Sequence, residues 1–218
     1  MEAIENKNER RSLRQKVYED IMQEIITCKL PPGDTISELQ FVERYQVSKT
    51  PIREALTALQ KDGLVHYTPN RGFMVAPISI RDVQEIFEAR IFFETMLFRL
   101  ALANITDENI AVLESLSEVG DGLDNPAELD VTMKTNEKFH LEIARIAGNS
   151  RLLEYYRRLL NEAQQLIYLD LKSSNVTPIW QTSHHTIMAA IQNRDEETGI
   201  RCIREVLLKA KRRILGTE

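Results

Sequence analysis

The sequence predicts a mainly α-helical protein with two domains of different character. In residues 12–77, three amphipathic helical segments are followed by two short apolar runs on either side of a turn-forming stretch. From residue 78 onward the chain reads as helix after helix, with no strand pattern. Between the two lies Ala76-Pro77, where proline interrupts the pattern, so the predicted domains are 12–77 and 78–218.

The composition is that of an ordinary soluble globular protein. The 218 residues are 43% hydrophobic and 28% charged, which is sufficient for two buried cores. The sequence contains no apolar run near the roughly 18 residues of a membrane span, and the N-terminus lacks the apolar core of a signal peptide. Cys28 and Cys202 fall in apolar helical patterns, so we expect buried free thiols in a reducing cytoplasm.

The net charge of −5 argues against a generally basic coat for nucleic acid. Residues 1–78 hold 11 basic and 11 acidic side chains, so the deficit lies in the second domain. Binding to DNA would therefore depend on where individual cationic side chains lie rather than on bulk charge.

The first domain is predicted to begin with helices. A polar arm over 1–11, which we expect to be flexible, precedes the first of them. The proline- and glycine-containing stretch 29–34 ends that helix, Ser37 is placed to cap the second, and Gly63 closes the third. The predicted helices cover 12–28, 37–45 and 48–62.

A β-hairpin is predicted after the third helix. Two short apolar runs, 64–67 and 73–75, flank the turn-forming sequence Thr-Pro-Asn-Arg-Gly at 68–72. Three helices followed by a hairpin make a winged helix-turn-helix. In that fold the third helix enters a major groove of DNA and the hairpin tip reaches the adjacent backbone or minor groove.

The start of the third helix combines features that suit an anionic partner. Ser48 is placed to cap it, and Pro51 lies in its first turn, where a missing amide donor costs nothing. Lys49, Thr50 and Arg53 lie near this end, where free backbone amides and the helix dipole already favour negative charge.

The run Ser-Lys-Thr-Pro-Ile-Arg-Glu-Ala-Leu at 48–56, with Gly63-Leu64-Val65 and Arg71-Gly72 after it, resembles the DNA-binding domain of the GntR family of bacterial transcription regulators. Lys49 stands where that family usually has arginine, and lysine suits a phosphate contact better than a bidentate base contact. The resemblance implies DNA contacts from Arg44, Ser48, Lys49, Thr50, Arg53, Asn70, Arg71 and Gly72. We expect a homodimer on a pseudo-palindromic site of double-stranded DNA.

The second domain is predicted to be an all-α bundle of about six helices, with a loop over 120–126. Capping residues and prolines mark where the helices begin, and basic residues fill the last turn of the final helix. The predicted starts are Ser79, Thr106, Glu128, Ser150, Pro178 and Asp195.

Polar residues interrupt the apolar stripes of these helices. Arg90, Asn136, His140 and His184 each share a helical face with apolar neighbours. Desolvating such groups is costly unless they find partners, and converging polar groups inside a bundle are typical of a ligand pocket. Two structural explanations compete: a buried histidine can be an ordinary hydrogen-bonded core residue, and Arg90 can pair with Glu94 at i,i+4 spacing.

Residues 79–215 resemble the FCD ligand-binding domain of the FadR-type branch of GntR regulators. The matching segments are Glu88-Ala-Arg-Ile-Phe-Phe-Glu94, Asn136-Glu-Lys-Phe-His140, Ala147-Gly-Asn149, and His184 followed by Ile187. Many such domains hold a divalent metal through an aspartate four residues before the first histidine and two later histidines. This sequence has Asn136 in place of the aspartate and Val206 near the third histidine position, which leaves His140 and His184 as strong ligands.

The residues leave two interpretations of this pocket. In the simpler one, a carboxylate or similar metabolite binds directly to Arg90, Asn136, His140 and His184. In the other, His140 and His184, with Asn136, weakly hold a divalent metal such as zinc or nickel.

The predicted function is that of a DNA-binding transcription regulator, a repressor whose operator affinity is modulated by a small metabolite. The alternatives are a metal-dependent regulator or metalloenzyme-like bundle using His140 and His184, and a regulator that responds to no small molecule. Because the sequence offers no nucleophile–base pair, no phosphate loop and no complete metal triad, we expect that the protein is not an enzyme.

Overall fold

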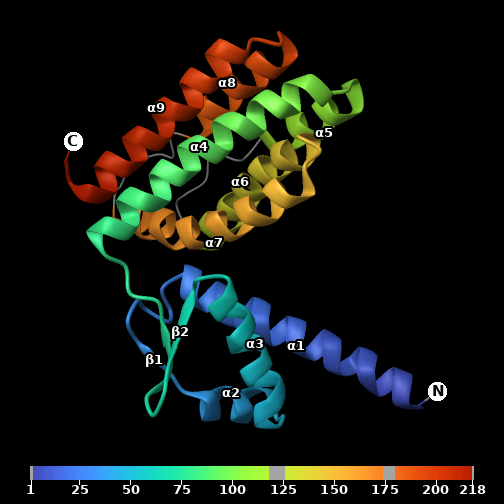
Figure 1. Cartoon of the computed structure of the whole chain (residues 1–218), viewed down its shortest axis with the longest axis vertical. Helices are drawn as coiled ribbons and strands as arrows, with labels where there is room; N and C mark the ends of the chain where they lie inside the picture. The colour runs from blue at the N-terminus through green and yellow to red at the C-terminus, as the bar shows by residue number, and fades with distance from the viewer. Residues whose placement is uncertain (1, 118–125, 174–179, 218) are drawn as a thin grey trace. The chain divides into compact units, whose positions relative to one another are not determined.

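The computed structural model describes residues 2–117, 126–173 and 180–217. The chain divides into two compact units, Met1–Ser79 and Ile80–Glu218 (Figure 1). The domain boundary predicted after residue 77 falls two residues before this division.

The first unit has the predicted three helices and hairpin. Helix α3 packs against α1, α2 and β2, and its apolar residues Ile52, Leu56 and Leu59 are fully buried. From α1, Val17, Ile21 and others at helical spacing complete the core. The elements are α1 (Glu2–Ile26), β1 (Thr35–Ile36), α2 (Glu38–Tyr45), α3 (Lys49–Lys61), β2 (Val65–Thr68) and β3 (Gly72–Val75).

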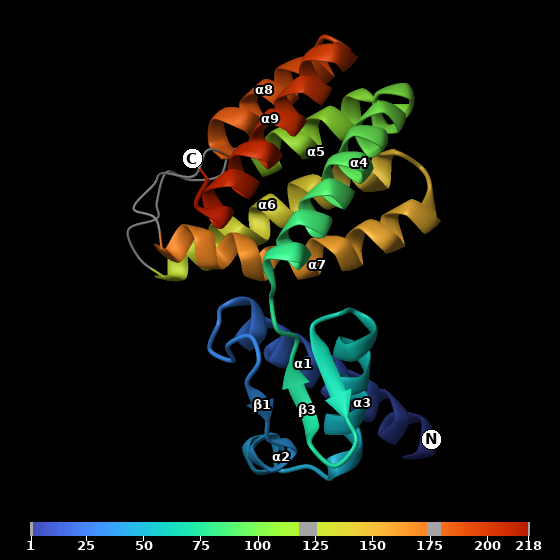
Figure 2. The same ribbon diagram turned by 60° about the vertical axis from the view of Figure 1, so that its left-hand side comes forward.

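The hairpin is part of a three-stranded antiparallel sheet of order β1-β3-β2 (Figure 2). Strand β1, which the sequence did not predict, pairs Ile36 with Phe73 of β3. A two-residue strand is too short to show an alternating pattern, and its pairing depends on a partner almost 40 residues away. The small sheet is the scaffold that holds the hairpin tip.

The prediction of a flexible arm over residues 1–11 was wrong, because helix α1 already begins at Glu2. Between Glu2 and Ile26 the chain contains neither proline nor glycine and is rich in Glu, Arg, Lys and Gln, which favour helices. Once a helix is nucleated on the core-facing residues from Val17 onward, adding each further residue costs little, so it extends toward the N-terminus.

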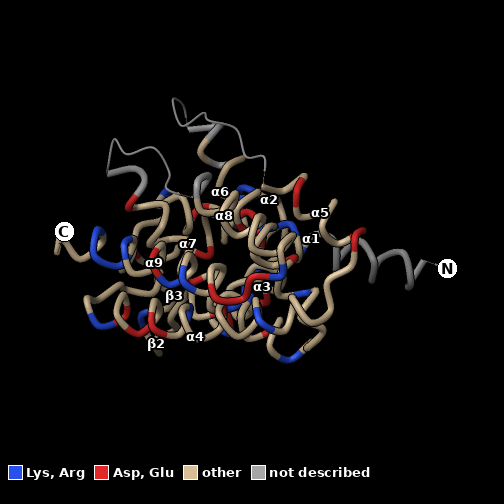
Figure 3. The backbone as a smooth tube through the Cα atoms, turned by 90° about the horizontal axis from the view of Figure 1, so that it is seen from above, with Lys and Arg blue, Asp and Glu red and all other residues tan. Residues whose placement is uncertain are grey.

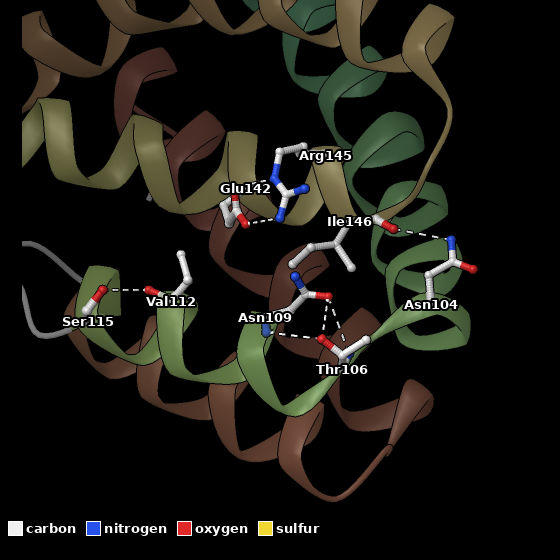
Figure 4. Close-up of polar contacts among 8 residues, drawn as sticks. All are labelled: Asn104, Thr106, Asn109, Val112, Ser115, Glu142, Arg145 and Ile146. Atoms are coloured by element: carbon white, nitrogen blue, oxygen red, sulfur yellow. Dashed lines mark hydrogen bonds and ion pairs between the residues drawn. The ribbon is translucent and has the colours of Figure 1, made fainter.

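Side-chain caps fix where several helices begin. The side chain of Ser37 accepts a hydrogen bond from the Gln40 backbone at 3.5 Å, and that of Asp195 accepts one from Thr198 at 3.0 Å, as predicted. At the start of α5, the backbone N–H of Asn109 donates to the Thr106 hydroxyl (Figure 4). These caps satisfy first-turn amides that would otherwise lack partners.

The second unit is an all-α bundle, as predicted. Its described helices are α4 (Ile80–Asn104), α5 (Asp107–Ser117), α6 (Pro126–Ile146), α7 (Ser150–Ser173), α8 (Trp180–Gln192) and α9 (Glu196–Leu215). Helix α4 packs against α9, α6 and α7 (Figure 1). At Gly199 of α9 a Cβ would lie 2.1 Å from the Phe98 ring of α4, so this close crossing requires glycine. Most of the predicted loop 120–126 and the start predicted at Pro178 lie outside the described residues.

The two cysteines are less buried than expected. Cys28 and Cys202 are not joined by a disulfide, and they are half-buried rather than fully buried. Cys28 lies just past the end of α1, and Cys202 lies at the edge of α9's buried face.

Basic and acidic residues are interspersed along the helices (Figure 3). Within the described ranges, no helix is sufficiently long and apolar to cross a membrane.

Candidate functional site

The N-terminal end of α3 is exposed. Ser48, Lys49 and Thr50 all face solvent. Ser48 occupies the N-cap position with an extended backbone, but its hydroxyl makes no capping hydrogen bond, contrary to the prediction. The first-turn amides and a hydroxyl therefore lie beside Lys49, an arrangement that can receive phosphate oxygens.

Arg53, one turn along α3, is held by a residue that the sequence reasoning missed. Its Nε donates to Glu38 Oε2 at 2.7 Å, and its Nη2 donates to Oε1 at 3.3 Å. The Arg53 side chain is 61% exposed. Glu38, the first residue of α2, thus orients the guanidinium of Arg53. To contact DNA, this guanidinium would have to leave the Glu38 carboxylate.

Arg44 has a partner as well. Its guanidinium pairs with Glu24 of α1 and lies 4.9 Å from the centre of the Phe41 ring. This pair joins α2 to α1, while a contact from Arg44 to DNA stays a prediction. With its side chain 48% exposed, Arg44 is not removed from solvent.

The hairpin tip is a tight turn. The N–H of Arg71 donates to the Thr68 carbonyl at 3.0 Å, and Asn70 has φ 66°. Proline at the second position and a left-handed residue at the third are typical of a type II turn, which asparagine tolerates. Gly72 follows with φ 81°, a conformation that favours glycine. The Asn70 and Arg71 side chains are exposed at this tip.

The second unit contains a cavity of about 60 Å³. Helices α4, α6, α7, α8 and α9 all contribute to its wall. The apolar part is formed by Ile167, Ile187, Ile203, Val206, Leu207 and Ala210, and the polar part by Arg90, Glu94, Asn136, His140, Asp170, Ser183 and Arg213. The cavity therefore brings together three of the four predicted effector residues.

Two ion pairs form much of the polar wall. Arg90 Nε donates to Glu94 Oε1 at 2.8 Å, and both side chains are about 5% exposed or less. Arg213 Nε donates to both carboxylate oxygens of Asp170, at 2.7 and 2.9 Å. The i,i+4 pairing of Arg90 confirms the structural explanation, and it places the guanidinium at the cavity wall at the same time.

His140 lines the cavity, with Nδ1 3.5 Å from Glu94 Oε2. Burial, and then the Arg90 guanidinium, lower the pKa of His140 to about 3. The Glu94 carboxylate is already paired with Arg90, so it does not reverse that direction. At neutral pH His140 is therefore an uncharged imidazole.

His184 does not line the cavity. Its ring stacks on Phe139 at 4.1 Å and lies 5.4 Å from the His140 ring, between centroids. In the part of the chain that the structure describes, neither of its nitrogens has a hydrogen-bond partner. Burial above all lowers its pKa to about 3. His184 therefore lies against the His140 ring and outside the lining of this cavity.

The polar residues that line the cavity make a poor binding site for a divalent metal. Across the described ranges, no group of three or more His, Cys, Asp or Glu residues is arranged to hold one. Asn136 and Val206, which the sequence comparison placed at two metal-ligand positions of the resembling domains, both line the cavity. The nearest carboxylate, Glu94, is neutralised by Arg90, a guanidinium that would repel a cation. The residues do not fit a zinc or nickel ion.

Sequence reasoning missed Asp170, Ser183 and Arg213. Asp170 could have been found, since it continues the buried helical stripe of Ala163 and Leu166. Arg213 was interpreted only as a charge that complements the dipole of the last helix, because its partner lies 43 residues away.

Comparison with protein families gives two matches. The model described as "Bacterial regulatory proteins, gntR family" matches residues 13–75, and the FCD domain model matches residues 85–209.

Similar proteins agree with these matches. The chain is 30% identical over 167 residues to the Nta operon transcriptional regulator of Aminobacter aminovorans, covering 76% of this chain and 78% of that one. It is 25% identical over 201 residues to the HTH-type transcriptional repressor RspR of Escherichia coli strain K12, covering 92% and 88%. Among solved structures, E. coli McbR/YncC superposes with a TM-score of 0.77 at 23% identity, over 90% of this chain and 94% of that one.

Proposed function

Because this chain belongs to the GntR family of DNA-binding transcription regulators and carries an FCD domain, we propose that it is a repressor released from its operator by a small molecule. The proposal rests above all on the cavity of the second unit, where Arg90, Asn136 and His140 converge in an otherwise apolar wall. A repressor is also named among its relatives.

The proposed effector carries a carboxylate. Arg90 can donate to it, and the amide of Asn136, which also lines the cavity, can donate as well. His140 is neutral and supplies one N–H or one acceptor. We propose binding without a metal, since the donor set is poor for a divalent cation.

The proposed output is DNA affinity. A homodimer in the cytoplasm would place two α3 helices on a pseudo-palindromic operator, with Lys49, Thr50 and Arg53 at the groove and Asn70 and Arg71 at the wing. An effector that prefers one pose of the DNA-binding units needs a differential affinity of only about 1–3 kcal/mol to change occupancy noticeably.

A gel-shift assay on the chain's own upstream region, at low salt, tests this function. We expect a shifted band that a set of carboxylic acids weakens and that a chelator leaves unchanged. Asn136→Ala should keep DNA binding and lose the response, whereas Asn193→Ala, at an exposed position just past the end of α8, should change neither. Failure to bind any palindromic site from that region would contradict the regulator mechanism proposed.

A further inference from the structure

Four ionised side chains face one small cavity. Arg90 and Glu94 come from α4, Asp170 from α7 and Arg213 from α9. Each member of the two pairs is at least about 85% buried. Two positive and two negative groups sum to zero, and the neutral His140 adds nothing to this balance. Among the described residues, the charges of the cavity wall are therefore balanced.

This balance restricts the ligand's net charge. An uncompensated charge in a desolvated site is costly, and a partner removed from a buried pair leaves its counterpart unpaired. A plain carboxylate would add one negative charge to a wall whose two arginines are already paired with carboxylates. Among the described residues of the wall, His140 could restore neutrality by taking up a proton, but burial and Arg90 oppose this.

We propose that the effector is a small zwitterion, with a carboxylate and an ammonium group in one molecule. Its carboxylate would bind Arg90 and Asn136, and its ammonium would bind Asp170, so each end meets the opposite sign while the sum stays zero. The inference rests on the proposed function, since it concerns the ligand of the same cavity, and it replaces a broad class, carboxylates, with amino-acid-like molecules.

Volume sets the size of this molecule. On this measure about 10–15 Å³ is enough to hold one water molecule, so a cavity of about 60 Å³ has room for roughly four to six water-sized groups. The apolar wall formed by Ile187, Ile203 and Leu207 leaves space for a short aliphatic portion but no further charge. Glycine, alanine, β-alanine and 4-aminobutyrate span this range.

Matched ligand pairs on the full chain test the proposal. Titration calorimetry would compare glycine with acetate, alanine and β-alanine with propionate, and 4-aminobutyrate with butyrate. In at least one pair we expect the amino compound to bind tenfold or more tightly than its carboxylate analogue. Repeating that titration in buffers of different ionisation enthalpy should show no net proton uptake.

Two variants test the charge balance directly. Asp170→Asn makes the wall net positive and should reverse the preference in favour of the plain carboxylate. Arg213→Gln makes it net negative and should weaken binding of every carboxylate-bearing probe. As a matched control, Glu196→Gln removes a carboxylate from the exposed pair with Arg99 and should leave the preference unchanged.

If a variant does not fold, the ligand titrations of the wild-type chain are sufficient to test the proposal. Equal affinity within every pair, carboxylate binding with uptake of one proton, or binding of none of these compounds would each overturn the zwitterion. An amino compound that binds tightly but leaves operator affinity unchanged supports the ligand class and contradicts the proposed function instead.

Discussion

The arginine–carboxylate pairs described for the first unit are exposed, whereas the second unit contains buried pairs as well as exposed ones. In the first unit, the arginines of the Arg44–Glu24 and Arg53–Glu38 pairs are 48% and 61% exposed. In the second, Arg90 and Glu94 are 4% and 5% exposed. The same chemical contact therefore does two different things in one chain.

Exposure decides what each pair can do. A solvated pair contributes little to stability, and its partner can be exchanged for a phosphate at little cost. A buried pair is costly to separate, because each member left alone has lost water without a replacement. The arginines of the first unit could therefore exchange partners at little cost, while the two buried pairs of the bundle give its cavity a defined charge.

The largest effect is expected from breaking the buried pair of α4. Arg90→Ala leaves Glu94 buried without its partner and should lower the free energy of unfolding by about 3–5 kcal/mol, measured by urea denaturation. Arg81→Ala removes the arginine of an exposed pair with the same spacing on the same helix and should have almost no effect. Equal losses in the two variants would remove the contrast between buried and exposed pairs.

The stability of the second unit should also depend on acid, because His140 and His184 are buried there. His140 and His184 have folded pKa values near 3 and ordinary values near 6.5 once unfolded. The unfolded chain therefore binds protons first, so stability is full above about pH 6.5 and falls as pH drops toward 3. The expected slope is about 1.4 kcal/mol per pH unit for each histidine.

Denaturation midpoints between pH 7 and pH 5 measure this slope. Replacing His184 with glutamine should reduce it, whereas His185→Gln, on the exposed face of the same helix, should not. A slope that is unaffected by His184→Gln would show that its burial has no such cost.

On the DNA face, the expected effects are on binding rather than folding. Arg53→Ala should weaken binding to the specific operator roughly tenfold or more and relax its sequence preference, because a guanidinium can read base edges. Lys49→Ala should instead reduce the salt dependence by roughly one unit of slope, with preference kept. Fluorescence anisotropy across a salt series checks both. Equal losses with unchanged preference would contradict this division.

The smallest effect is expected from Glu24→Gln. Its pair with Arg44 is half-exposed, so the loss in unfolding free energy should stay below about 1 kcal/mol. A urea titration measures it, with Gln15→Ala on the same helix as the control. A loss as large as that of Arg90→Ala would place the Arg44 pair among the structural ones.

Local features of the first unit were largely predictable. Helical spacing located α2 and α3 to within a residue or two, the proline- and glycine-containing stretch 29–34 located the break before α2, and Gly63 located the end of α3. Strand β1 was not predictable, because Ile36 becomes a strand residue only by pairing with Phe73. The unpredicted N-terminal part of α1 shows how cooperativity extends a helix beyond its apolar stripe.

The candidate site of the second unit was half predictable. Arg90, Asn136 and His140 were found because polar residues at core-facing helical positions stand out in a sequence. The same signal placed His184 in the interior but could not show that it lies behind His140 rather than at the cavity wall. That distinction depends on ring orientation, which spacing does not encode.

By itself, the sequence determined the order and type of the elements, the GntR and FCD character and the polar residues that face inward. These follow from periodicity, capping and local motifs, which act over a few residues. Only the tertiary structure decided the charge partners, Glu38 for Arg53 and Asp170 for Arg213. Periodicity states which face of a helix is buried, but packing alone decides which side chain of another helix meets it.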